Sequence, residues 1–360
     1  GDLYINNILV NTPKYKHYAI SHSNRYLPYV IPEIAPYSLP NNNEYQIFTF
    51  VYDSSNNNGA GQTEYTINFN EETTCDILVV GGGGGGGTSY SSASSVPGAG
   101  GGAGGLIFLE NQTITSGQYT IKVGRGGDGD IYTDTSYQRG KNGFNSSFSY
   151  LQTEAIGGGG GGSRIGTTKG GDGGSGGGSV MIGETAQNGG LGTISDIVKY
   201  DGTILKTNYR QGFDGGETTA SSITNSEPFS GGGGGAGEPG NNNLETGVND
   251  DGDGGIGKSM EGGIDFKTLF GITNTNIGEH HTDGKLYFAG GGGTGYRYTS
   301  SNSSTGGLGG GGNSTSGNGE NGLPNTGGGG SGARASESRG RWNGGNGGSG
   351  IVIIRCKISK

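Results

Sequence analysis

The chain has 360 residues, of which 87 are glycine, and its formal net charge at pH 7 is −9. Only 28 % of the residues are hydrophobic, which argues against an ordinary enzyme core, and the lack of a Gly-X-Y register excludes collagen. The 22 lysines and arginines are scattered, so we expect neither nucleic-acid binding nor attachment to anionic lipids. No apolar run exceeds five residues, and we expect no membrane insertion.

Residues 1–44 form an arm that is rich in Tyr, Asn and Pro. Its prolines disfavour a helix and favour extended backbone. The arm has no core of its own, and we expect it to add as a strand to a neighbouring subunit, which would make the assembly a homo-oligomer.

Residues 45–360 form a second unit, a glycine-rich domain in which strand patterns flank the glycine blocks. Residues 64–69 alternate polar and apolar side chains, which is the period expected of a half-buried strand. No segment shows a sustained helical stripe. We therefore predict a mainly β fold with almost no α-helix. Its β-sandwich would be built from the segments 45–80, 106–124 and 351–356. Within these segments we predict the strands 45–52, 63–69, 75–80, 106–110, 119–123 and 351–356.

Glycine-dominated blocks fill the region from about 81 to 350 at irregular spacing. Fixing a glycine costs about 0.5–1 kcal/mol more than fixing an alanine, and the blocks have no side chains to offset that cost. Backbone hydrogen bonds can offset it, at about 1 kcal/mol net each. The geometry that uses them most fully is a bundle of polyproline-II helices, and we predict such a polyglycine bundle with loops at its ends.

Several segments occur in a specific order along the chain: Cys75–Val80, Gly81–Gly87, Gly98–Ile107, Tyr119–Gly124 and Gly344–Arg355. This order resembles that of the glycine-rich domains in surface proteins of large algal DNA viruses. More distantly, the chain resembles the glycine-rich ectodomain of anaplastic lymphoma kinase receptors and the polyglycine adhesins at bacteriophage tail tips. The resemblance implies a TNF-like or jelly-roll β-sandwich that carries a polyglycine-helix bundle, with loops at the bundle's end contacting a partner. It lends no catalytic residue.

The two cysteines lie on strands that enter and leave the glycine-rich region. If these strands pair antiparallel with Cys75 opposite Cys356, then Val80 lies opposite Ile351. Directly opposed residues can be close enough for a disulfide. A disulfide and a pair of buried, reduced thiols are both compatible with the sequence.

One acidic loop is the candidate for a bound cation. Asn249, Asp251 and Asp253 imitate the first half of a calcium loop, but position twelve is Met260 and flanking helices are missing. Solvated turn carboxylates are the alternative. The overlapping segment 252–259 fits the phosphate-loop pattern but lacks the strand before it and the helix after it. We predict no cofactor other than this calcium candidate and no catalytic residue.

Two kinds of surface residue are candidates for modification or binding. The glycosylation sequons begin at Asn111, Asn145, Asn302 and Asn313. Aromatic residues that lie between glycine blocks are expected at the ends of the bundle, where they could stack on sugars or pack on their own bundle. These aromatic candidates are Tyr209, Tyr296, Tyr298 and Trp342.

We expect a non-enzymatic structural and adhesive protein located outside the cell or on a virion surface. It would present loops on a rigid polyglycine bundle to a cell-surface receptor or glycan, or build a fibre. One alternative is a glycan- or receptor-binding module that acts through the loop aromatics. Another is an ice-binding protein, which would need a flat bundle face lined by Ala, Ser or Thr.

Overall fold

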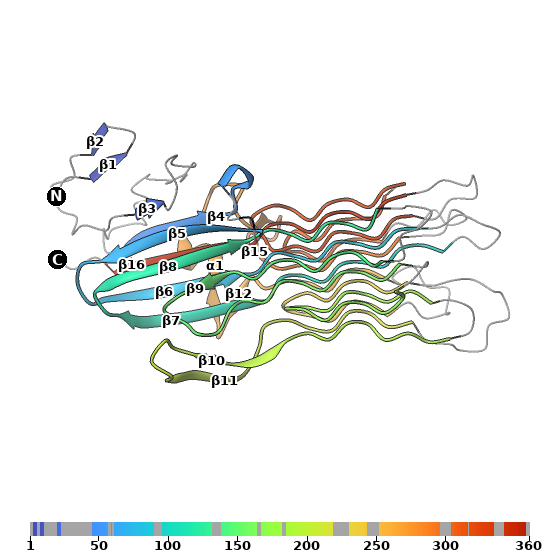
Figure 1. Ribbon diagram of the computed structural model, residues 1–360, viewed down its shortest axis with the longest axis horizontal. Helices are drawn as coiled ribbons and strands as arrows, with labels where there is room; N and C mark the ends of the chain where they lie inside the picture. Colours follow the sequence, from blue (N-terminus) through green and yellow to red (C-terminus); the bar gives the residue numbers. More distant parts are fainter. Residues whose placement is uncertain are drawn as a thin grey trace.

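The structure is a computed structural model, shown in Figure 1. It describes residues 3–5, 8–10, 20–22, 45–56, 59, 61–89, 96–131, 138–163, 167–181, 185–218, 230–242, 252–295, 304–315, 317–334 and 342–357. Among these residues no helix has the length and apolar character needed to cross a bilayer.

One sheet of the sandwich has four antiparallel strands in the order β4-β16-β6-β7. The strand β16, the last of the chain, lies between two strands that precede the glycine-rich region. The register of β16 with β6 sets Cys356 opposite Cys75 and Ile351 opposite Val80, as predicted. The four strands are Tyr45–Val51 (β4), Thr73–Val80 (β6), Leu106–Ile114 (β7) and Ile351–Lys357 (β16).

The second sheet has the order β3-β5-β8-β9 and faces the first across an apolar core. Side chains of β5 alternate between buried and half-buried positions, which confirms the predicted period of two. Ile67 of β5 and Ile121 of β8 meet Ile77 and Val352 of the first sheet in this core. The strands are Ile20–His22 (β3), Gln62–Phe69 (β5), Gly117–Gly124 (β8) and Ser147–Phe148 (β9).

The outer face of the first sheet is also covered. Leu78 of β6 and Phe108 of β7 pack there against the helix α1, residues Phe266–Phe270, and against Phe288. Asp265 caps the start of α1 through a bond from the Thr268 amide, and Gly271 ends it in a left-handed conformation. Because both faces of β6 are covered, its apolar run from Ile77 to Val80 is fully buried.

Several short elements complete the description. A two-stranded ribbon, β10–β11, runs beside β7 at the edge of the first sheet (Figure 1). The remaining pairs are β1–β2, β12–β13 and β14–β15. The bounds are Leu3–Ile5 (β1), Ile8–Val10 (β2), Ile194–Val198 (β10), Ile204–Arg210 (β11), Met260–Glu261 (β12), Ile264–Asp265 (β13), Glu279–His280 (β14), Leu286–Tyr287 (β15) and the 3-10 turn Ser54–Asn56.

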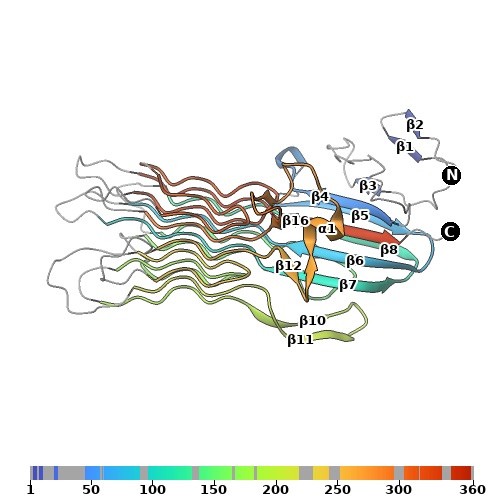
Figure 2. The same cartoon turned by 180° about the vertical axis from the view of Figure 1, so that it is seen from behind.

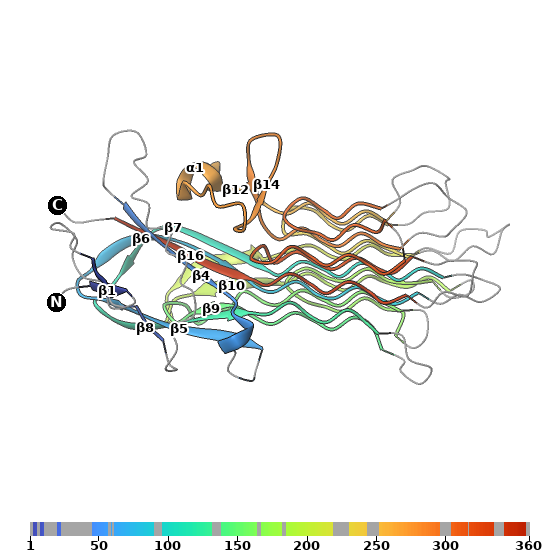
Figure 3. The same cartoon turned by 90° about the horizontal axis from the view of Figure 1, so that it is seen from above.

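A bundle of extended glycine rods leaves one end of the sandwich, as Figures 1 and 2 show from opposite sides. Figure 3 shows from above that the rods run side by side in more than one layer. This arrangement is the predicted polyglycine bundle, since the rods have neither helical nor strand assignment and bond to one another.

The rod Gly81–Gly87 shows how the bundle is held together. The amides of Gly81, Gly84 and Gly87 donate to one neighbouring rod, at N–O distances of 2.8–2.9 Å. Those of Gly82 and Gly85 donate to a second rod, and those of Gly83 and Gly86 to a third. This repeat of three residues is that of polyproline-II backbone. Three further rods donate to carbonyls of the same segment, so this rod has six bonded neighbours.

Glycine is required here because of close approach between backbones. A Cβ atom added to Gly82, Gly83 or Gly84 would lie well inside 3 Å of a carbonyl group of a neighbouring rod. Some rod positions hold alanine in place of glycine. Ala99 and Ala103 are fully buried in such positions.

The predicted mainly β fold with almost no helix is confirmed. The six predicted strands correspond to β4, β5, β6, β7, β8 and β16, with ends that differ by up to four residues. Within the arm 1–44, β3 pairs with β5 of its own chain. The rest of the arm is outside the described residues, apart from the β1–β2 pair.

Candidate functional site

The end of the bundle away from the sandwich is a layer of buried hydroxyl side chains. Each lies where a rod finishes or begins, and Figure 1 shows this end opposite the sheets. All but Thr88 are 0 % exposed, so the rods remain packed up to their last residues. The layer contains Thr88, Ser163, Ser179, Ser230, Thr294 and Ser304. We refer to it below as the hydroxyl layer.

Three rods are joined in this layer by one carboxylate. The hydroxyl groups of Thr88 and Ser163 both donate to Oδ2 of Asp130, at 3.0 Å and 2.7 Å. The Thr88 amide donates to the Ser163 hydroxyl at 3.0 Å. Burial of the Asp130 carboxylate raises its pKa, and the two hydroxyl bonds oppose that shift only in part.

Stability at this end should therefore increase on acidification. A carboxyl whose pKa is raised by folding binds its proton more tightly in the folded state. This tighter proton binding adds to the free energy of unfolding. The added stability is complete below the unfolded pKa of about 3.9 and is lost as the pH rises through the higher pKa of the folded state. We expect Asp130→Asn to remove this part of the pH dependence of the unfolding free energy, measured by urea titration from about pH 3.5 to 7.

The exposed Asp201 supplies a control, because its pKa shift has the opposite sign to that of Asp130. A bond from the Thr203 amide lowers its pKa, so its contribution is lost as the pH falls. Asp201→Asn should leave the effect of Asp130 in place. A profile for Asp130→Asn that parallels the wild type would contradict the assignment.

A second set of hydroxyl side chains joins other rods in the same layer. Ser230 and Thr294 share a short hydrogen bond, and Thr294 also donates to the Gly98 carbonyl at 3.0 Å. Ser304 donates to the Thr294 carbonyl. The described chain enters the segments 90–95, 219–229 and 296–303 from this layer, so their stems are held in fixed positions relative to one another.

The direction of several rods could have been read from the sequence. Apolar residues flank the rods at the sandwich, as in Val80 before Gly81, Leu106 after Gly105 and Ile351 after Gly350. Hydroxyl residues flank them at the far end, as in Thr88 and Ser163. Sequence reasoning missed this signal because it treated both flanks of a glycine block alike.

Asparagine and aspartate side chains close the sides of the bundle. Where an outer rod has no further neighbour, a side-chain oxygen accepts the amide that a backbone carbonyl would otherwise accept. The spacing is three residues, which matches the rods. Asn142 and Asn145 accept from the amides of Gly160 and Gly157, and Asn318 and Asn321 from those of Asn343 and Asn346, at 2.8–3.0 Å.

The aromatic candidates are placed differently from one another. Tyr209 lies in β11 beside the sandwich and is buried, because residues 194–210 return to the sheets as a ribbon. Trp342 is half-buried near the hydroxyl layer, and its carbonyl accepts from the Ser89 amide at 3.2 Å. Its buried Nε1 has no hydrogen-bond partner in the described part of the chain. Tyr296 and Tyr298 lie outside the described residues.

The sequons differ in how their side chains are engaged. Asn111 is exposed in a left-handed conformation (φ 52°) at the bulge of β7. The Asn145 side-chain nitrogen donates to Glu154 at 2.7 Å and its oxygen accepts from the Gly157 amide, so a glycan on Nδ2 would compete with the bond to Glu154. Asn313 accepts from the Gly306 amide at 2.9 Å. Asn302 lies outside the described residues.

The calcium candidate is only partly described. Asp253 accepts from the Thr305 amide at 2.6 Å and so holds two outer rods together. Asn249 and Asp251 are outside the described residues. No group of three metal-ligating side chains occurs in the part of the chain that the structure describes.

The cysteine side chains lie opposite one another as free, buried thiols. Burial raises the pKa of Cys356, and a hydrogen bond with Cys75 adds to the shift. The protonated thiols therefore pack as part of the sandwich core.

The sequence matches the family described as a glycine-rich domain over residues 57–357. This range contains the bundle and all of the sandwich except β3, β4 and their flanks. None of the curated proteins matches the sequence.

Proposed function

The chain belongs to the glycine-rich domain family, and from that premise we propose that it is a non-enzymatic structural and adhesive protein of the cell exterior or virion surface. Its work is to hold variable loops in fixed positions at the end of a rigid bundle. The resemblance to viral surface proteins and phage adhesins supports this proposal.

The hydroxyl layer is the observation that carries the proposal. Described rods end there on both sides of the segments 90–95, 132–137, 219–229 and 296–303, and buried hydrogen bonds join their last residues. A scaffold bonded in this way fixes the spacing of the residues on either side of these segments, which reduces the entropy lost when a partner binds.

Two features of the bundle favour loop presentation over ice binding. Large apolar side chains stand exposed on outer rods, among them Ile131, Leu191 and Leu323. Ion pairs between residues three apart, such as Arg125–Asp128 and Lys169–Asp172, also have exposed side chains. Neither feature suits a flat face of small residues.

Binding of the purified chain to a glycan array and to intact host cells tests the proposal. We expect saturable binding that is lost in the double variant Tyr296→Ser/Tyr298→Ser, with an unchanged melting temperature. The matched control is Tyr200→Ser on the β10–β11 ribbon, which should bind like the wild type. Absence of binding by the wild type, or equal binding by the loop variant, would count against presentation by these loops. Thermal hysteresis would favour the ice-binding alternative.

A further inference from the structure

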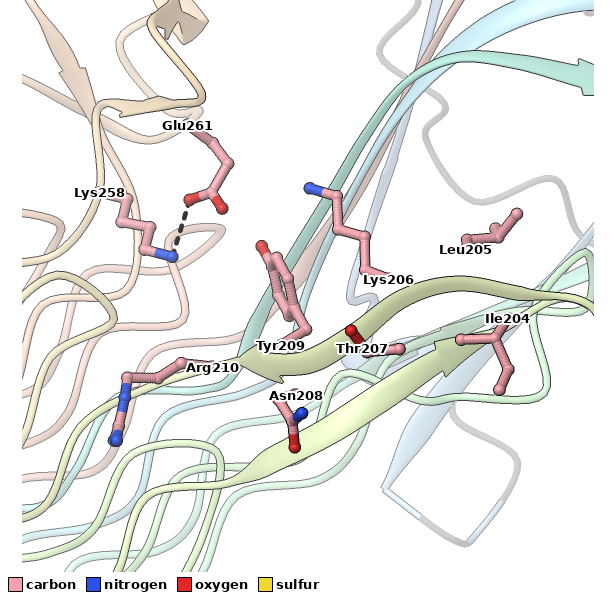
Figure 4. A pocket seen from close by; sticks show the side chains of 9 residues that line it. All are labelled: Ile204, Leu205, Lys206, Thr207, Asn208, Tyr209, Arg210, Lys258 and Glu261. Atoms are coloured by element: carbon pink, nitrogen blue, oxygen red, sulfur yellow. Dashed lines mark ion pairs between the residues drawn. The ribbon is translucent and has the colours of Figure 1, made fainter.

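A basic groove lies between the β10–β11 ribbon and the edge of the sandwich (Figure 4). Its volume is about 570 Å³, within the usual range for ligand sites. Side chains of β11 line one wall, and Lys258 and Glu261 lie across from them. The groove is therefore at the sandwich, away from the hydroxyl layer and the loops.

Side chains hold the ribbon beside β7. Lys206 donates its ammonium group to the Phe108 carbonyl at 3.0 Å, and the Phe108 amide donates to the Tyr209 hydroxyl at 3.3 Å. These side chains occupy the hydrogen-bonding groups of Phe108 that a further strand would use. One backbone bond, from the Leu106 amide to the Gln211 carbonyl at 3.0 Å, joins β7 to the chain just after β11. Beside β11 itself the connection to Phe108 is made by side chains, so β11 stands off from β7 and the groove stays open.

Positive charge gathers in this groove although the whole chain is acidic. The ammonium groups of Lys206 and Lys258 lie 4.9 Å and 5.4 Å from the centroid of the Tyr209 ring. Arg210 also lines the groove. Glu261 is the single acidic lining residue, and it is already paired with Lys258 at 2.8 Å.

Lys206 is the group that an anion would satisfy. It is half-buried, and no carboxylate of the described residues lies within 4 Å of its ammonium group. Its one hydrogen bond to Phe108 leaves two N–H donors for a ligand. Desolvation lowers its pKa, and the more distant carboxylates of Glu261 and Glu110 oppose that shift only in part.

We propose that this groove binds an acidic saccharide of the uronate class, with a sugar carboxylate on Lys206. A second carboxylate reaches Lys258, while Glu261 accepts hydrogen bonds from hydroxyl groups. The wall follows the seven residues of β11, roughly 23 Å of strand, a shape that suits a linear polymer.

Titration of the full chain with tetragalacturonate, followed by amide chemical shifts, tests this proposal. We expect saturable shifts along β11 that weaken as salt increases. Lys206→Gln should weaken binding about tenfold or more, since a charge-assisted hydrogen bond is lost, and Lys206→Arg should retain most of it. Lys141→Gln changes the charge equally on an exposed bundle residue and should bind like the wild type.

Lys258→Gln keeps the side chain available to hydrogen-bond Glu261 and removes its charge at a site that does not contact β7. Lys258→Gln should also weaken tetragalacturonate binding. If Lys206→Gln does not fold, the binding of Lys258→Gln tests the proposal in its place. Equal binding by the charge-removing variants, equal binding of neutral maltotetraose, or no saturable shifts with the wild type would overturn the proposal. Since the groove is apart from the loops, such a result would leave loop-mediated adhesion untouched.

Discussion

Gly84→Ala should cost at least about 3 kcal/mol of unfolding free energy, the upper range for overpacking. Gly84 lies in the rod with six bonded neighbours, and its Cβ would overlap the backbone of Gly159. Because that neighbour is itself bonded on several sides, it cannot move aside without breaking hydrogen bonds. Urea unfolding of the variant and the wild type measures the difference.

Two controls separate overlap from other effects of the substitution. Gly202→Ala adds the same methyl group at φ +87°, where no atom lies within 4 Å, so only backbone strain of about 1–2 kcal/mol is expected. Ala103→Gly removes a buried methyl group from a rod and frees the unfolded backbone, so it should cost about 1–2 kcal/mol. Unfolding of Gly84→Ala at the wild-type urea concentration would contradict the close packing of rods.

Asp76→Ala should be the second severe change, at about 3–5 kcal/mol. Asp76 of β6 pairs with Arg355 of β16 at 2.7 Å, with side chains only 6 % and 13 % exposed. Its other oxygen accepts from the Asn111 amide at the bulge of β7, at 2.9 Å. The variant would leave both the guanidinium and this amide without their acceptor. Denaturant unfolding checks the value.

A matched pair on the bundle surface gives the comparison. Arg125 and Asp128 also form an Arg–Asp pair, but their side chains are 36 % and 38 % exposed. Asp128→Ala should therefore cost no more than about 1 kcal/mol. The double variant Asp76→Leu/Arg355→Met should recover much of the loss, since apolar replacement of a buried pair is often neutral. Equal losses for Asp76→Ala and Asp128→Ala would refute the role of burial.

Much of the architecture follows from local sequence. The alternation at residues 64–69 and the apolar runs at 77–80 and 351–354 identify strands whose burial the structure confirms. The register of Cys75 with Cys356 follows because both strands must deliver the chain to the same end of the bundle. The glycine runs predict the bundle because neighbouring backbones lie so close together that a Cβ atom would overlap them.

Other features depend on contacts that a linear pattern does not contain. The strands β12 to β15 have two residues each, too few for a period to be visible. The helix α1 has five residues and no stripe, although Asp265 and Gly271 are recognisable caps. The sequence pattern predicts Tyr209 in a loop at the end of the bundle, but the structure places it on the β10–β11 ribbon, where it is buried. The pattern fails because residues between two glycine blocks can also return to the sandwich.

Hydrogen–deuterium exchange of individual amides tests most directly whether hydrogen-bonded glycine backbone forms the interior of this protein. All seven amides from Gly81 to Gly87 should be protected, because each donates to a backbone carbonyl of one of three surrounding rods. The backbone amides of Asn142 and Asn145 donate to no described residue and should exchange fast in the same sample. Exchange of the Gly81–Gly87 amides at the rate of an unfolded chain, while β6 and β16 stay protected, would contradict the account.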